Sequence, residues 1–160
     1  MEALVCIRSA TLADTGIINR IIERSIRIGC AFDHRNDPLL VSDWVSQSSV
    51  DFISGRLADP DFYLCLALLE EKPVGVGMAE AGGKISLCYV QPESFRRGVG
   101  RALMQSLEGW LRIRGVQHFH LNSSRTAEPF YRHLGYQQAS PAFTSDSQTV
   151  PLHKSLLSPD

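Results

Sequence analysis

The sequence predicts one α+β domain, with a mixed, mostly antiparallel central sheet of about seven strands flanked by about four helices. The length of 160 residues is close to that of one ordinary domain. A hydrophobic share of 44% and a charged share of 21% are globular averages, which excludes disordered and fibrous classes. Helical and strand periodicities alternate along the chain without an internal repeat or a long linker. We therefore treat residues 1–160 as a single domain.

The first third of the chain is predicted to hold one strand and two helices. Residues 4–8 alternate weakly, as a short strand does. Thr11-Leu12-Ala13-Asp14 resembles a capping box with Asp at the third helical position, and an amphipathic helix follows as far as Gly29. The apolar stripe of that helix contains Ile17, Ile18, Ile21, Ile22, Ser25 and Ile28. A polar loop over 30–38 then leads to a second helix over 41–57.

The middle of the chain changes to strand character after turn chemistry at Asp59-Pro60-Asp61. A nearly continuous apolar run begins at Phe62, and Pro92 ends the last strand of this group. The predicted strands cover 62–70, 74–80 and 85–90, with turns at 71–73 and 81–84 between them.

The last third returns to helical spacing. Residues 99–114 place Leu103, Leu107 and Leu111 on one side, and Gly115 fits the C-terminal cap of that helix. The remaining elements are a strand over 116–122, a short helix over 126–133, and strands over 135–139 and 149–156.

The net charge and the spacing of the cysteines limit which partners and metals we expect. A formal net charge of −1 gives no single-sign field of the kind that attracts nucleic acid or a membrane surface, and we expect neither partner. No run approaches the ~18 apolar residues of a membrane span, and the first residues lack signal-peptide features, so we expect a cytoplasmic protein. Cysteines occur without a Cys-x-x-Cys pair, so we expect no metal; they are Cys6, Cys30, Cys65 and Cys88.

One segment has the pattern of an anion site. A strand ending at Val90 runs into a loop with Gly98 and Gly100 and then into a strong helix, whose first amides lack internal partners. Arg96, Arg97 and Arg101 add positive charge there. A P-loop would need Gly-Lys-Ser/Thr, and a Rossmann fingerprint would need a third glycine, and neither is present. The alternative is a glycine-containing helix start with a solvated basic face.

A second segment contains a candidate proton donor. Residues 124–136 follow a predicted strand and form a short helix ended by Gly135, with Phe130 and Leu134 on its buried face. Tyr131 lies next to that face, and its hydroxyl can donate a proton. The alternative is a packed aromatic side chain with a satisfied hydroxyl.

Together the two segments resemble the GCN5-related N-acetyltransferase (GNAT) superfamily, in particular its small bacterial-type members. The resemblance covers the order of elements, the Tyr89-Val90-x-Pro92 run, and the run Ala127-x-x-Phe130-Tyr131-x-x-x-Gly135-Tyr136 about 30 residues later. It implies acetyl-CoA as the donor, bound by loop amides at the pyrophosphate and by residues 87–90 along the pantetheine, beside a splayed strand.

The resemblance also assigns residues. Tyr131 matches the frequent general acid of the family. Phe95 replaces the usual Gln or Arg, and Ser124 stands where Asn is frequent, so these two side chains depart from the family pattern. The candidate cofactor-binding residues are Cys88, Tyr89, Val90, Phe95, Arg96, Arg97, Gly98, Val99, Gly100, Arg101, Ser124 and Phe130.

The base and the acceptor site stay open. Base candidates are Asp33, His34, Glu80 and Tyr89, none of which the sequence favours. Cys88 is more readily a packed strand cysteine than an acyl carrier. We expect acceptor specificity from the first two helices and the loop 30–40 between them, and from 140–148 with Phe143. Phe32, His34 and Trp44 are the candidate pocket walls, with a core position as the alternative for Trp44.

The predicted function is acetyl-CoA-dependent N-acetylation of a primary amine by direct attack on the thioester. The acceptor is a small molecule or a peptide, and a homodimer is left open. An acyl-CoA-binding sensor without turnover is the alternative from another class. A third hypothesis, an interaction domain within a larger assembly, is not supported by any tail or repeat.

Overall fold

Seven strands form two neighbouring sheets in the computed structural model, which describes residues 4–25, 50–94, 96–138 and 150–156. The first sheet is antiparallel throughout and has the order β1 (Val5–Ser9), β2 (Phe62–Leu69), β3 (Lys72–Glu80) and β4 (Ile85–Val90). The second has the order β5 (His118–Ser123), β7 (Val150–Ser155) and β6 (Gln137–Gln138). The predicted fold class, with its strand count and antiparallel character, is confirmed.

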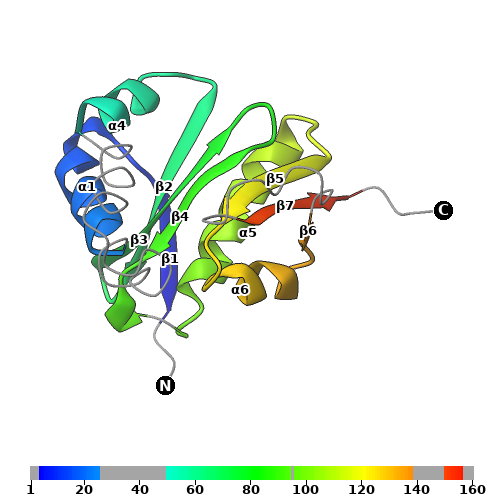
Figure 1. Cartoon of the computed structure of the whole chain (residues 1–160). Coiled ribbons are helices and arrows are strands. Elements are labelled where there is room, and N and C mark those ends of the chain that lie inside the picture. The colour runs from blue at the N-terminus through cyan, green and yellow to red at the C-terminus, as the bar shows by residue number, and fades with distance from the viewer. Residues whose placement is uncertain (1–3, 26–49, 95, 139–149, 157–160) are drawn as a thin grey trace, which may run out of the picture.

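Helices cover both faces of the first sheet (Figure 1). α1 (Thr15–Arg24) and α4 (Val50–Leu57) pack on one face, and α5 (Val99–Ile113) packs on the other. α6 (Glu128–His133) follows β5, and two short 3₁₀ turns lie at Leu12–Asp14 and Pro92–Ser94. None of the described helices is long and apolar enough to cross a membrane.

The near-continuous apolar run of β2 has a direct explanation in these two layers. Leu64 and Leu66 belong to the core under α1 and α4, whereas Cys65 and Ala67 belong to the core under α5. A strand buried on both faces has no need for alternating polar residues.

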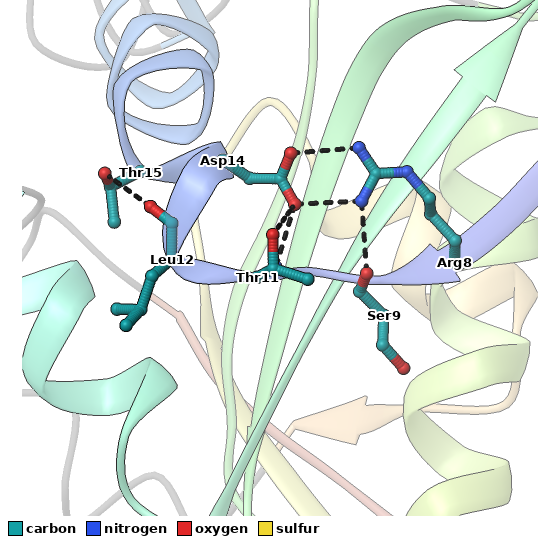
Figure 2. Close-up of polar contacts among 6 residues, drawn as sticks. All are labelled: Arg8, Ser9, Thr11, Leu12, Asp14 and Thr15. Carbon is teal, nitrogen blue, oxygen red and sulfur yellow. Dashed lines mark hydrogen bonds and ion pairs between the residues drawn. The ribbon is translucent and has the colours of Figure 1, made fainter.

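The link between β1 and α1 rests on Asp14. Its carboxylate accepts two hydrogen bonds from the Arg8 guanidinium, at 2.8 and 2.9 Å, and one from the Thr11 N–H at 2.8 Å (Figure 2). The predicted capping box between Thr11 and Asp14 is therefore present, with Arg8 as an added partner of the carboxylate. The predicted end of this helix at Gly29, the loop over 30–38 and the first part of the second helix, over 41–49, lie outside the described residues.

The turn predicted at 71–73 was placed too late. The observed turn consists of Glu70 and Glu71, with Leu69 paired to Lys72, so that β3 begins at Lys72 and includes Pro73. Both glutamates have positive φ, 53° and 69°, as a two-residue type I′ hairpin requires.

β4 and β5 converge at one end and diverge at the other (Figure 1). Among the described residues, an isolated parallel bridge between Lys84 and His120 joins the two sheets, next to a hydrogen bond of 3.0 Å from the His120 N–H to the Gly83 carbonyl. Gly83 has φ +113°, and a Cβ there would lie 2.5 Å from the His118 carbonyl oxygen. Glycine is therefore required for this close approach.

Candidate active-site groove

The divergence of β4 and β5 opens a groove of ≈ 970 Å³. One side is the edge of β4, the other is β5 with the start of α6, and the first turn of α5 lies at one end. The predicted residues that line it are Cys88, Tyr89, Val90, Arg96, Gly98, Val99, Gly100, Arg101, Ser124, Phe130 and Tyr131. The structure thus brings together residues from the two segments that the sequence singled out.

The α5 end of the groove offers backbone donors. Gly98 is the N-cap of α5 with φ +80°, and the Ala102 N–H makes the first helical bond to the Gly98 carbonyl, at 3.1 Å. Amide groups before Ala102 have no carbonyl four residues back within the helix, so they can bind an anion. Arg96, itself at φ +64°, and Arg101 line this end. Arg97 is exposed on the same loop, and Phe95 lies outside the described residues.

Gly100 has a packing role in addition. A Cβ at this position would lie 3.0 Å from the Phe130 ring, so the missing side chain lets α6 rest on the start of α5. The contact joins the two predicted segments across the groove.

Tyr131 is buried beneath the groove, with 7% of its surface exposed. Burial, together with the neighbouring Cys88 thiol, raises the pKa of the Tyr131 hydroxyl well above its usual value. Burial likewise raises the pKa of the Cys88 thiol to about 12. Both groups therefore hold their protons at neutral pH, so Tyr131 can donate a proton and Cys88 is no thiolate nucleophile.

The hydroxyl of the neighbouring Tyr136 is hydrogen-bonded to a residue outside the groove lining. Its ring lies 6.0 Å from that of Tyr131, but its hydroxyl donates to the buried Glu108 carboxylate at 2.9 Å. Lys154 also donates to Glu108, at 3.1 Å. Of these two tyrosines, Tyr131 is the one that lines the groove.

Sequence reasoning missed the contribution of α1. The Ser25 hydroxyl donates to the Val90 carbonyl at 3.0 Å, and Arg24 donates to Gln91 at 3.0 Å and to Glu93 at 2.8 Å. These bonds fasten the end of α1 to the end of β4 and the loop after it. A signal existed: Ser25 is a polar residue within the apolar stripe of the predicted helix.

The remaining lining residues were also not predicted. They come from the start of β4 and the residue before it, from the 3₁₀ turn after β4, from β5, from the loop into α6 and from α6 itself. The polar residues of β5 alternate as in an ordinary solvated strand. The main ones are Lys84, Ile85, Ser86, Ser94, Leu121, Asn122, Ser123, Thr126, Ala127, Pro129 and His133.

The remaining candidate residues lie at the closed end of the groove, along its lining, or outside the described residues. The Glu80 carboxylate lies at the closed end and accepts a hydrogen bond from the Ser86 hydroxyl. Ser124 lines the groove, and its hydroxyl also accepts the Ala127 N–H at 3.2 Å. The candidates for the base and the acceptor site outside the described residues are Asp33, Phe32, His34, Trp44 and Phe143, with the loops 30–40 and 140–148.

The comparisons with known proteins agree with this geometry. The family model described as an acetyltransferase (GNAT) domain matches residues 31–154, and the chain belongs to that family. A GCN5-related N-acetyltransferase structure from Rhodopseudomonas palustris has a TM-score of 0.82 at 22% identity and 98% coverage of both chains. The structure of PaiA N-acetyltransferase from Thermoplasma acidophilum in complex with coenzyme A has a TM-score of 0.80 at 14% identity, covering 95% of this chain and 99% of that one.

A curated relative is similar over a shorter stretch. N-alpha-acetyltransferase 80 of Mus musculus is 36% identical over 102 residues, which cover 52% of this chain and 32% of the mouse protein. The match therefore spans about a third of that relative's length.

Proposed function

We propose that this domain transfers the acetyl group of acetyl-CoA to a primary amine by direct attack on the thioester. The observation that carries the proposal is the groove between the diverging strands, which has helix amides and two arginines at one end and the Tyr131 hydroxyl along its length. That arrangement suits a long ligand with a phosphorylated end and a reactive thioester end. The coenzyme A in one fold neighbour supports the same ligand class.

The residues divide the binding task. The amides at Gly98 to Arg101 would hold the pyrophosphate, with Arg96 and Arg101 as charged partners. The edge of β4 over 87–90 would hydrogen-bond the pantetheine, because it faces the groove while its other edge pairs with β3. Phe130 would close the groove beside the arm of the ligand.

Amide formation then needs three events. A neutral amine attacks the thioester carbonyl, charge develops on the carbonyl oxygen, and the thiolate leaves. A backbone N–H of β4 between Cys88 and Val90 would stabilise the oxygen, and Tyr131 would protonate the sulfur. The high pKa of Cys88 argues for this direct route over an acyl-enzyme.

The test is turnover of acetyl-CoA with a pool of amines, detected as free thiol. The pool contains alkylamines, amino acids, polyamines and peptides with free N-termini, and product mass identifies the acceptor. We expect thiol release that depends on both protein and amine. Binding of acetyl-CoA without turnover of any amine would instead favour the sensor alternative.

A further inference from the structure

The closed end of the groove contains a carboxylate–hydroxyl pair. Ser86 lines the groove, and its hydroxyl donates to the Glu80 carboxylate. Register explains this placement: Met78 pairs with Leu87 and Ala79 pairs with Ile85, so Ser86 is the extra residue of a β-bulge. A bulge turns a side chain out of the regular alternation, which here lets Ser86 contact both Glu80 and the groove.

This pair lies on the reacting side of the groove. Ser86 is two residues along β4 from Cys88, which lines the groove together with Tyr131, and this corresponds to about 6–7 Å of strand. The amides of α5 are at the opposite end of the groove from the Lys84–His120 bridge. A ligand with its phosphates at α5 therefore points its other end toward Ser86.

The chemistry requires a proton acceptor there. An alkylamine with a pKa near ~10 is neutral in only about one molecule in a thousand at pH 7, and an ammonium group cannot attack a carbonyl. None of the residues described as lining the groove is a carboxylate, and Glu80 is the carboxylate hydrogen-bonded to one of them at its closed end.

We propose that Ser86 and Glu80 form the proton relay that converts the acceptor ammonium to the attacking amine, a role that rests on the proposed acetyl transfer. The ammonium proton passes to the Ser86 oxygen while the Ser86 proton passes to the Glu80 carboxylate. The neutral amine then forms the C–N bond as the C–S bond breaks and Tyr131 protonates the sulfur. The surplus proton on the new amide nitrogen passes through solvent to Tyr131 and restores its hydroxyl. Ser86 contacts the substrate, and Glu80 acts through Ser86. Glu80 ends the step protonated and then releases that proton to solvent.

Charged and titratable neighbours come from three elements. Asp61 precedes β2, and its carbonyl accepts the Ala81 N–H at 2.8 Å. Lys84 directly precedes β4, and His118 and His120 lie on β5 beside the same turn. Asp61→Asn and His120→Gln are therefore the controls, since each removes a titrating neighbour and keeps the Glu80–Ser86 pair.

The test compares an acceptor that is an ammonium ion at pH 7, 2-phenylethylamine, with one that is largely neutral, phenylhydrazine. For Glu80→Gln and Ser86→Ala we expect kcat/KM with the ammonium acceptor to fall about 10²-fold, the lower reach of general base catalysis. With phenylhydrazine the loss should stay below about threefold. Raising the pH from 7 to 9.5 should make the loss of kcat/KM with 2-phenylethylamine at least tenfold smaller, because much of this amine is then already neutral in solution.

Three readouts separate a relay from a structural hydrogen bond. KM for acetyl-CoA and the thermal shift with CoA should stay within the parent's range in both variants, and Glu80→Asp should restore part of the loss. Equal losses with both acceptors, or losses independent of pH, would overturn the relay. If the pH dependence of kcat/KM with the ammonium acceptor is lost in Asp61→Asn or His120→Gln, that neighbour rather than Glu80 is the proton acceptor. A parent that binds acetyl-CoA but acetylates neither probe nor any amine of the pool contradicts the proposed function itself.

Discussion

Single side chains decide what the groove can do, and Tyr131 is the clearest case. Two buried tyrosines lie side by side, but the Tyr136 hydroxyl is held by Glu108 while the Tyr131 hydroxyl meets Cys88 at the groove. A raised pKa makes Tyr131 a reliable proton carrier but a weak acid. In the proposed reaction, proton transfer from Tyr131 to the leaving sulfur would therefore occur late, as the C–S bond breaks and negative charge builds on the sulfur.

Tyr131→Phe should lower kcat by about 10²-fold and change acetyl-CoA affinity by less than about threefold, because the hydroxyl acts mainly in the transition state. A thiol has a pKa of ~8.5 and leaves partly unassisted, which favours this lower end of the usual range. Steady-state kinetics under conditions where chemistry limits the rate, with calorimetry for affinity, measure both quantities. Tyr136→Phe is the matched control, and we expect it to affect stability but not kcat. An unchanged kcat in Tyr131→Phe would leave that residue with a packing role.

At the scale of elements, β1 is fastened to α1 by the Arg8–Asp14 pair (Figure 2). Hydrogen bonds from Arg8 and from the Thr11 N–H lower the Asp14 pKa from 3.8 to about 2, against the opposing effect of burial. Because the folded pKa is depressed, the unfolded chain binds the proton more readily. This contribution to stability is therefore full above about pH 4 and is lost as the pH falls through 2.

Asp14→Asn should reduce the free energy of unfolding at pH 7 by about 1–2 kcal/mol, a value discounted because Arg8 is 44% exposed to solvent. The difference between parent and variant should fall to about half at pH 3. Urea unfolding at pH 7, 5, 4 and 3 measures it. A difference that stays constant over this range would mean that Asp14 acts through packing or shape rather than charge.

Most elements could be predicted because hydrophobic period, glycine and proline act locally. The strand over 85–90 was predicted with its observed bounds, and the helix from Val99 was predicted to within one residue at its end. The Glu70–Glu71 turn could not be predicted, since positive φ at two glutamates contradicts their own preference and is imposed by pairing of β2 with β3.

Only the parts of the candidate site that are formed by residues close together in the sequence could be predicted. The glycine loop and the Tyr131 helix each have a local sequence signal, whereas the Glu80–Ser86 contact depends on a bulge and the Ser25–Val90 bond spans 65 positions. Neither long-range register nor a bulge is visible in a hydrophobic pattern. The general acid, the acceptor and the cytoplasmic location stay predictions.

At the scale of the whole molecule, the groove is where the two sheets separate. Near Lys84 and His120 they are bridged, and toward Val90 and Ser123 they part. At the open end the Phe130 ring of α6 packs against the backbone of Gly100 in α5, so these two helices join the two walls of the groove. A ligand that contacts both walls should therefore stabilise the entire fold.

Acetyl-CoA at 100 times its Kd should raise the free energy of unfolding by ~2.7 kcal/mol through mass action. Gly98→Glu should abolish that gain, because it places a carboxylate beside amides that would hold a pyrophosphate. Since Gly98 has φ +80° and open space around it, any side chain there is strained, and Gly98→Ala is the control for strain without charge. We expect Gly98→Ala to unfold at a lower temperature but to keep most of the gain from acetyl-CoA, whereas Gly98→Glu should lose it. Thermal unfolding with and without acetyl-CoA measures both, and an equal gain in the glutamate variant would place the phosphate site elsewhere.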